Sequence, residues 1–254
     1  MKFNLPIAID EKIWKISLNR VFVLAESRTG STWLIETLNS HPQIGMLDEI
    51  IKPEVFGSDL LSNSPCGGQQ VNLKYIEKKV EEIDGGIKGC KILFPQAIRF
   101  LDFYEFLNNY KDSYFILLTR RNRIKAEVSD LIANRFSRWH LHKTVGVQPV
   151  FIEPSFLLER LQWRKLTAEF CIRLVRSHCN KILELNYEDL FSDLAIEISR
   201  IADFLNVMGD QFTFSSEIKA NPFSLDQMII NYDQCRDFLI KDTDYASMLE
   251  EHGQ

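Results

Sequence analysis

Residues 21–33 read Val-Phe-Val-Leu-Ala-Glu-Ser-Arg-Thr-Gly-Ser-Thr-Trp, and the fold of the chain can be worked out from this stretch. Its first five residues are apolar, which predicts a buried strand of a parallel sheet. A short polar turn follows, and the apolar spacing of residues 31–39 is that of a helix. The first N–H groups of a helix are unpaired, and the helix dipole favours negative charge there. We therefore expect a phosphate to bind at residues 28–32.

This turn differs from the loop that binds nucleoside triphosphates. The pattern Gly-x-x-x-x-Gly-Lys-[Ser/Thr] would need a glycine where the chain has Leu24 or Ala25, and no lysine precedes Ser31 or Thr32. The cation of the turn is Arg28, whose planar guanidinium can bind a phosphate or sulfate oxygen. An ATP-dependent small-molecule kinase is therefore only an alternative function, and a non-catalytic nucleotide-binding module is a third.

The turn resembles a loop of the sulfotransferases that use 3'-phosphoadenosine 5'-phosphosulfate (PAPS). That loop has the form basic-[Ser/Thr]-Gly-[Ser/Thr]-[Ser/Thr], often followed by Trp. The resemblance implies that five consecutive residues hold the 5'-phosphosulfate group: Arg28, Thr29, Gly30, Ser31 and Thr32. It also implies that Trp33 stacks on the adenine, with core packing as the alternative.

The resemblance implies a fold as well. We expect a three-layer α/β/α domain with a mostly parallel central sheet, of the P-loop nucleotide-kinase type. A single sulfotransferase domain would span residues 1–254, since the length of 254 residues suits one large domain or at most two. Residues 1–19 would pack on the sheet as an N-terminal extension, and residues 207–254 would complete the site.

The composition of the chain disfavours several classes of binding partner. A net charge of -5 does not favour general binding to nucleic acid or to an anionic membrane. No apolar run approaches the ~18 residues of a membrane span, and residues 1–15 lack the core of a signal peptide. The five cysteines include no Cys-x-x-Cys pair, which favours a reducing compartment, and we expect a cytoplasmic protein. No metal site is expected, because the pair His140 and His142 has no third ligand nearby.

The pair Asp48-Glu49 follows a short extended segment, whose C-terminal end should lie beside the phosphate loop. In the branch of the family that sulfates sugars and other aliphatic alcohols, a segment like Ser-His-Pro-x-Ile leads to a glutamate that acts as general base. Glu49 occupies that position, and Asp48 is the second candidate. Lys91, inside the strand predicted over residues 87–94, is a candidate to stabilise the leaving phosphate. A solvated acidic pair and a surface lysine are the competing interpretations.

Residues 114–122 predict a second buried strand, with Arg120 and Arg121 where it leaves the sheet, and a helix that carries Ser129 follows. The resemblance implies that an Arg and a Ser eight residues apart hold the 3'-phosphate of the donor, which selects Arg121 and Ser129. Arg120 would replace Arg121 if the strand ended one residue earlier.

Three further expectations come from the second half of the chain. Residues 182–190 predict a strand that runs into a turn, and the resemblance implies that Tyr187 approaches the adenine. Lys219 is a candidate for the 3'-phosphate. Residues 154–179 predict a long amphipathic helix with several apolar side chains on or near one face, among them Leu157, Leu161, Leu166 and Phe170.

The expected reaction is sulfuryl transfer from PAPS to a hydroxyl group of a small polar acceptor. The acceptor would be a sugar or a hydroxylated secondary metabolite. Residues 55–70 and 137–154 are rich in loop-forming or aperiodic sequence, and we expect them to contact it.

Overall fold

The computed structural model describes residues 19–51, 61–63, 69–137, 148–213 and 223–249. Its centre is a five-stranded sheet in the order β2-β5-β1-β6-β7, and every neighbouring pair of strands is parallel. The strands are β1 (Arg20–Ala25), β2 (Ile44–Leu47), β5 (Ile87–Leu93), β6 (Tyr114–Thr119) and β7 (Lys181–Asn186). A separate antiparallel hairpin joins β3 (Leu61–Asn63) to β4 (Gln69–Val71).

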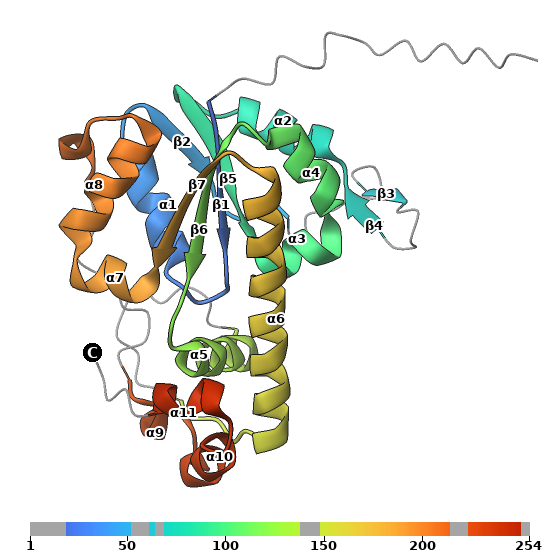
Figure 1. The fold of residues 1–254 in the computed structure, drawn as a ribbon, viewed down its shortest axis with the longest axis vertical. Helices are drawn as coiled ribbons and strands as arrows, with labels where there is room; N and C mark the ends of the chain where they lie inside the picture. Colours follow the sequence, from blue (N-terminus) through green and yellow to red (C-terminus); the bar gives the residue numbers. More distant parts are fainter. Residues whose placement is uncertain (1–18, 52–60, 64–68, 138–147, 214–222, 250–254) are drawn as a thin grey trace, which may run out of the picture.

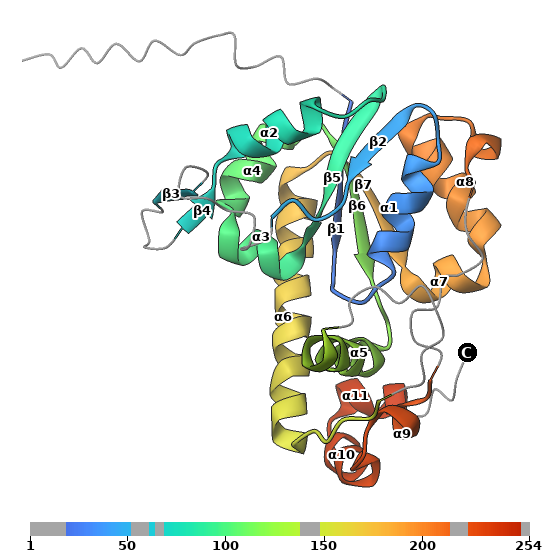
Figure 2. The same cartoon turned by 180° about the vertical axis from the view of Figure 1, so that it is seen from behind.

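Helices cover both faces of the sheet (Figures 1 and 2). One face carries α2 (Leu73–Glu81), α3 (Phe94–Phe100), α4 (Phe103–Tyr110) and the C-terminal half of α6 (Pro154–His178). The other carries α1 (Ser31–Asn39), α7 (Tyr187–Ser192) and α8 (Leu194–Leu205), which leads to a single 3-10 turn at Gly209–Gln211. The three-layer α/β/α fold is therefore confirmed.

Each face of the sheet has its own apolar core, because side chains alternate along a strand. In β1, Phe22 and Leu24 belong to the core under α2, α3, α4 and α6. Val21, Val23 and Ala25 belong to the core under α1, α7 and α8. All five are fully buried, which explains why this segment is a continuous apolar run.

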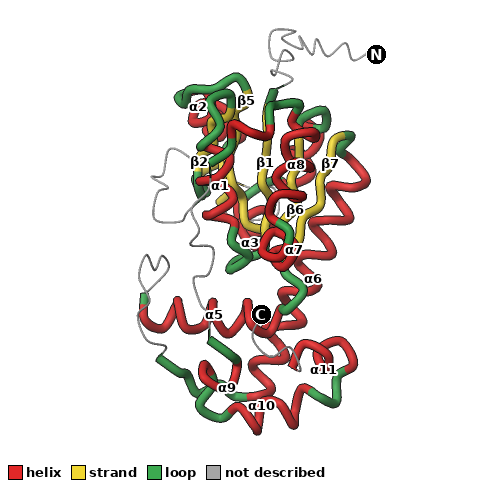
Figure 3. The backbone as a smooth tube through the Cα atoms, turned by 90° about the vertical axis from the view of Figure 1, so that its left-hand side faces the viewer, coloured by secondary structure: helices red, strands yellow, loops and turns green. Residues whose placement is uncertain are grey.

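A third core lies beyond the C-terminal ends of the strands, in a lobe made mainly of helices (Figure 3). The lobe contains α5 (Arg123–Phe136), the N-terminal half of α6, α9 (Leu225–Met228), α10 (Tyr232–Leu239) and α11 (Thr243–Leu249). It places α5 across the edge of the sheet where ligands of open parallel sheets bind. The long helix α6 links the lobe to the sheet.

Two local expectations are wrong. Residues 187–190 begin the helix α7 instead of a turn. In α6, Leu157 and Leu161 are buried, but Leu166 and Phe170 are exposed. At about 100° per residue, Leu166 lies on the opposite side of the helix from Leu157, so one core cannot receive both.

Some expectations fall outside the described residues. They concern residues 1–18, most of the stretches 55–70 and 137–154, the pair His140 and His142, and Lys219. Across the described ranges, each helix is too short or too polar to cross a membrane.

Candidate active site

The predicted anion loop joins β1 to α1 through two residues with left-handed backbone conformation. Gly30 is the N-cap of α1 with φ 73°, and a Cβ atom there would lie 3.1 Å from the Tyr187 ring. Both the left-handed conformation and the close approach of Tyr187 favour glycine at this position. Arg28 has φ 61°, which is uncommon for a residue with a side chain and costs about 1 kcal/mol or more. Strain of this kind is typical of a functional loop held in place by its surroundings.

The start of α1 suits an anion. Gly30 has no side chain to cap the helix, and the first turn holds no acidic residue, so the N–H groups of that turn meet no fixed negative charge. The hydroxyl of Thr29 donates to the Glu26 carbonyl oxygen at 2.8 Å and therefore shapes the loop itself. Trp33 is buried in the core under α1. Its predicted stacking on an adenine stays a prediction.

Lys91 joins the loop to the predicted base. Its side chain is 1% exposed, and Lys91 Nζ donates to Thr32 Oγ1 at 3.1 Å. The same Nζ lies 3.1 Å from Glu49 Oε1 and also forms an ion pair with Asp48. A lysine on an interior strand of the sheet is costly to bury unless its charge is paired, and here two carboxylates pair with it. The structure thus brings Glu49, Lys91 and Thr32 together, as the sequence predicted.

The second carboxylate oxygen of Glu49 is held from α3. Gln96 Nε2 donates to Glu49 Oε2 at 2.8 Å, and the Leu93 N–H donates to Gln96 Oε1 at 2.9 Å. The two ends of the Gln96 amide are therefore fixed, and so is the plane of the Glu49 carboxylate. Glu49 is half-buried and lies two residues beyond the C-terminal end of β2.

A second group of polar side chains surrounds Arg28. Arg28 Nε donates to Ser129 Oγ at 3.2 Å, so the predicted 3'-phosphate serine contacts the loop. Arg120 Nη1 donates to the Arg28 carbonyl oxygen at 3.0 Å, and its guanidinium lies over the Tyr187 ring at 4.4 Å. The ring in turn packs on Gly30. These contacts stabilise the left-handed conformation of the loop.

Of the two adjacent arginines, Arg120 is the one that lies at the loop. The Arg120 side chain is 11% exposed, whereas that of Arg121 is 53% exposed and forms an ion pair with Asp189. Because β6 ends at Thr119, Arg120 is the first residue beyond the strand. Arg120, which the sequence offered as the alternative, is thus the arginine that contacts the loop. The assignment of either arginine to a donor stays a prediction.

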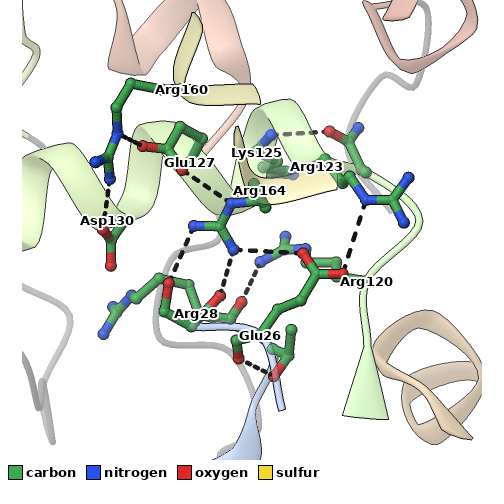
Figure 4. Close-up of polar contacts among 12 residues, drawn as sticks. Glu26, Arg28, Arg120, Arg123, Lys125, Glu127, Asp130, Arg160 and Arg164 are labelled. Carbon is green, nitrogen blue, oxygen red and sulfur yellow. Dashed lines mark hydrogen bonds and ion pairs between the residues drawn. The ribbon is translucent and has the colours of Figure 1, made fainter. Parts of the chain in front are cut away.

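An ionic network underlies the loop and ties it to the helical lobe (Figure 4). Arg164 of α6 donates from Nη1 to the Ser27 carbonyl oxygen at 2.9 Å and from Nη2 to Ser27 Oγ at 3.0 Å. Its Nε donates to Glu127 Oε2 at 2.8 Å, and Arg160 Nε donates to Glu127 Oε1 at 2.7 Å. One buried guanidinium therefore holds the loop, α5 and α6 together.

Glu26 is the buried carboxylate of this network. Its oxygens lie 3.5 Å from Arg164 Nη1 and 3.7 Å from Arg123 Nε, too far for hydrogen bonds. Burial raises the pKa of Glu26, which the two arginines oppose. Burial likewise raises the pKa of Asp130, and it lowers the pKa of Arg28. Desolvation thus raises the free-energy cost of charged side chains around the loop. An anionic ligand interacts more strongly with a cation there than it would in water.

The sequence did not identify Gln96, Glu127 or Arg164. Gln96 carried a signal, because a Gln at the third position of a helix often reaches back to the backbone at its start. Arg164 and Glu127 carried none, since the contact joins residues 37 positions apart. Among the described residues, no group of three or more His, Cys, Asp or Glu side chains could hold a metal ion.

A family model described as a sulfotransferase domain matches residues 18–228. The chain belongs to this family. It is therefore an enzyme of sulfate transfer, and the predicted family is confirmed. The match covers the sheet, the loop and the helices up to α9.

Solved sulfotransferases are also similar to this sulfotransferase. One from Alicyclobacillus acidocaldarius is 13% identical over 91% of this chain and 96% of its own, with a TM-score of 0.47. The sulfotransferase domain from the curacin biosynthetic pathway is 15% identical over 90% and 95%, with a TM-score of 0.42. A mouse sulfotransferase complexed with PAP is 12% identical over 92% and 88%, with a TM-score of 0.41. No curated protein matches the sequence significantly.

Proposed function

We propose that this chain transfers the sulfuryl group of PAPS to a hydroxyl group of a small polar acceptor, with Glu49 as general base. The observation that carries the proposal is the position of Lys91. Its ammonium group contacts Thr32 of the anion loop at 3.1 Å and Glu49 at 3.1 Å. One cation therefore bridges the place proposed for the donor and the place proposed for the acceptor.

The residues of the loop fit an anionic donor. The uncapped start of α1 offers N–H groups, and Arg28 adds a guanidinium beside Ser129. Arg120 adds a second guanidinium, which donates to the Arg28 carbonyl oxygen. In a chain of net charge -5, this local gathering of cations supports a ligand with phosphate groups at both ends of a nucleoside. PAPS supplies the activated sulfuryl group and needs no metal from the protein.

The proposed chemistry is an in-line displacement at sulfur. The O–H bond of the acceptor breaks as its oxygen bonds to sulfur, and the proton passes to the Glu49 carboxylate. The bond between sulfur and the 5'-phosphate oxygen breaks, and that oxygen keeps the electron pair. Lys91, Arg28 and the N–H groups of α1 stabilise the negative charge on the leaving phosphate. A positioned base contributes about 10²- to 10⁴-fold to the rate of such a step.

For the acceptor, we propose a sugar or a hydroxylated secondary metabolite. Asp48, which is 40% exposed beside Lys91, adds a second carboxylate at the entrance and suits a polar molecule. The proposed compartment is the cytoplasm. The free, buried state of Cys90, Cys171, Cys179 and Cys235 is consistent with it.

The first test is a thermal-shift titration with 3'-phosphoadenosine 5'-phosphate beside ADP and ATP, with and without magnesium. At ~100 times its dissociation constant, a ligand stabilises the fold by about 2.7 kcal/mol. We expect stabilisation by the 3'-phosphate compound alone, independent of magnesium. Stabilisation only by ATP with magnesium would replace the proposal by the kinase function.

The second test addresses the base. Glu49→Gln keeps the shape of the side chain but cannot take the proton, so turnover should fall ~100-fold while donor affinity changes little. Asp48→Asn is the matched control and should retain most of the turnover. If Asp48→Asn abolishes turnover and Glu49→Gln does not, Asp48 is the base.

A further inference from the structure

The solvent side of α6 carries large apolar side chains along most of its length. Phe156 is 45% exposed, Trp163 52%, Leu166 61% and Phe170 52%. At about 100° per residue, these four side chains fall within a sector of about 80°. An exposed apolar patch of this extent marks a contact surface far more often than a solvated face. In Figure 1, α6 is drawn unobstructed from end to end.

Two charged residues stand on this face in a symmetric arrangement. Glu159 precedes Leu166 by seven residues, and Arg173 follows it by seven, so both lie two helical turns from Leu166 on the same side. Both are exposed, and within the described part of the chain neither has a hydrogen bond or an ion pair. Trp163 precedes Leu166 by three residues, and Phe170 follows it by four.

If a second copy of α6 runs antiparallel to the first, the acidic residue of each helix lies opposite the basic residue of the other. We propose that α6 is a self-association surface on which a second copy of the chain packs, antiparallel, about a two-fold axis at Leu166. Leu166 then meets Leu166 of the other copy, and Trp163 of each copy meets Phe170 of the other. Glu159 of each copy lies opposite Arg173 of the other, which makes two equivalent ion pairs.

The composition of the surface suits a dimer. Its four exposed apolar side chains include three aromatic rings, and aromatic side chains are favoured at the centre of protein interfaces. The residues that hold the anion loop lie elsewhere, since Arg164 lies about 120° around α6 from the middle of this sector and contacts Ser27.

The test measures the association of the full chain by sedimentation equilibrium and by light scattering after size exclusion. The wild type should be a dimer at micromolar concentration. Glu159→Arg and Arg173→Glu should each raise the dissociation constant about tenfold or more, because each places two pairs of like charges together. The double variant with both substitutions should return to within about threefold of the wild type, since the pairs are restored with reversed sign.

The double variant separates a second copy from any other occupant. Restoration by exchanging both charges is expected only if Glu159 meets Arg173 of an identical chain. A monomeric wild type at 100 µM (about 3 mg/ml) overturns the proposal, and so does a dimer that these three variants leave unchanged. Leu166→Glu should give a folded monomer, with an unaltered circular dichroism spectrum and donor-induced thermal shift.

Discussion

The amide of Gln96 holds the carboxylate of Glu49 from α3, with 2.8 Å between Nε2 and Oε2. The amide oxygen of Gln96 accepts the Leu93 N–H at 2.9 Å, so the amide cannot rotate without losing one of the two contacts. Lys91 approaches Glu49 from the opposite oxygen. The proposed base is therefore fixed between a neutral donor and a cation, and the same cation also pairs with Asp48.

This arrangement makes Gln96→Glu informative. A glutamate at position 96 still accepts from the Leu93 N–H, but it places a second negative charge beside Glu49. The acid side of the pH profile of kcat should move to higher pH by about one unit, because like charges oppose ionisation of the base. Steady-state rates between pH 5 and 9 measure the shift. The unfolding temperature is the control for the helix start, and superimposable pH profiles would exclude a role of Gln96 at the base.

Arg120 and Arg121 should differ in their effect on donor binding. Arg120→Gln removes the contact with the Arg28 carbonyl oxygen and the stacking on Tyr187, so the dissociation constant of 3'-phosphoadenosine 5'-phosphate should rise about tenfold or more. Arg121→Gln removes an exposed ion pair, whose contribution is typically below about 1 kcal/mol, and should change affinity at most a few-fold. Isothermal titration calorimetry measures both. The reverse order would show that the arginine predicted from the sequence is the donor ligand.

Arg164→Lys should weaken the loop although it keeps the charge. A lysine ammonium cannot contact Ser27 twice and Glu127 at once, as the guanidinium does. We expect a loss of about 2 kcal/mol in the free energy of unfolding, together with weaker donor binding. Arg160→Lys is the matched control, because Arg160 is half-exposed and does not contact the loop. Urea unfolding curves compare the two, and equal losses would contradict the special role of Arg164.

Glu26 should give the stability of the protein a pH dependence. Burial raises its pKa in the folded state above that of the unfolded chain, so the folded state binds a proton more readily. This contribution is fully present below the unfolded value of about 4.3 and disappears as the pH rises through the folded pKa. The difference in unfolding temperature between wild type and Glu26→Gln should therefore shift in favour of the wild type from pH 7.5 to pH 5. Scanning calorimetry at the two values tests the sign.

The elements that build the sheet and the loop were accessible to sequence analysis because their signals are local. The apolar run of β1 and the start of α1 follow from consecutive residues, and α1 ends at Asn39 as predicted. Glu49 follows the end of β2, and Lys91 lies within the neighbouring strand β5. The parallel pairing of these two strands brings the two side chains together.

The rest of the site depends on contacts between distant segments. Arg164 reaches Ser27 across 137 positions, and no periodicity in α6 distinguishes it from an ordinary surface arginine. The choice between Arg120 and Arg121 depends on where β6 ends, which sequence patterns do not resolve to one residue. Leu166 and Phe170 were placed on or near the same face as Leu157 and Leu161, but nine residues at about 100° each put Leu166 on the opposite side of the helix from Leu157, where it is exposed.

The three separate cores have a consequence for how the protein can change over time. The lobe core shares no residue with either core of the sheet, and its link to the loop is made by charged side chains such as Arg164 and Glu127. Substitutions in the lobe core that keep Ser129, Glu127 and Arg164 in position should therefore leave β1 and the anion loop in place. Over evolution, the packing of the lobe can change on one side of the proposed site while the residues that bind the anion stay the same.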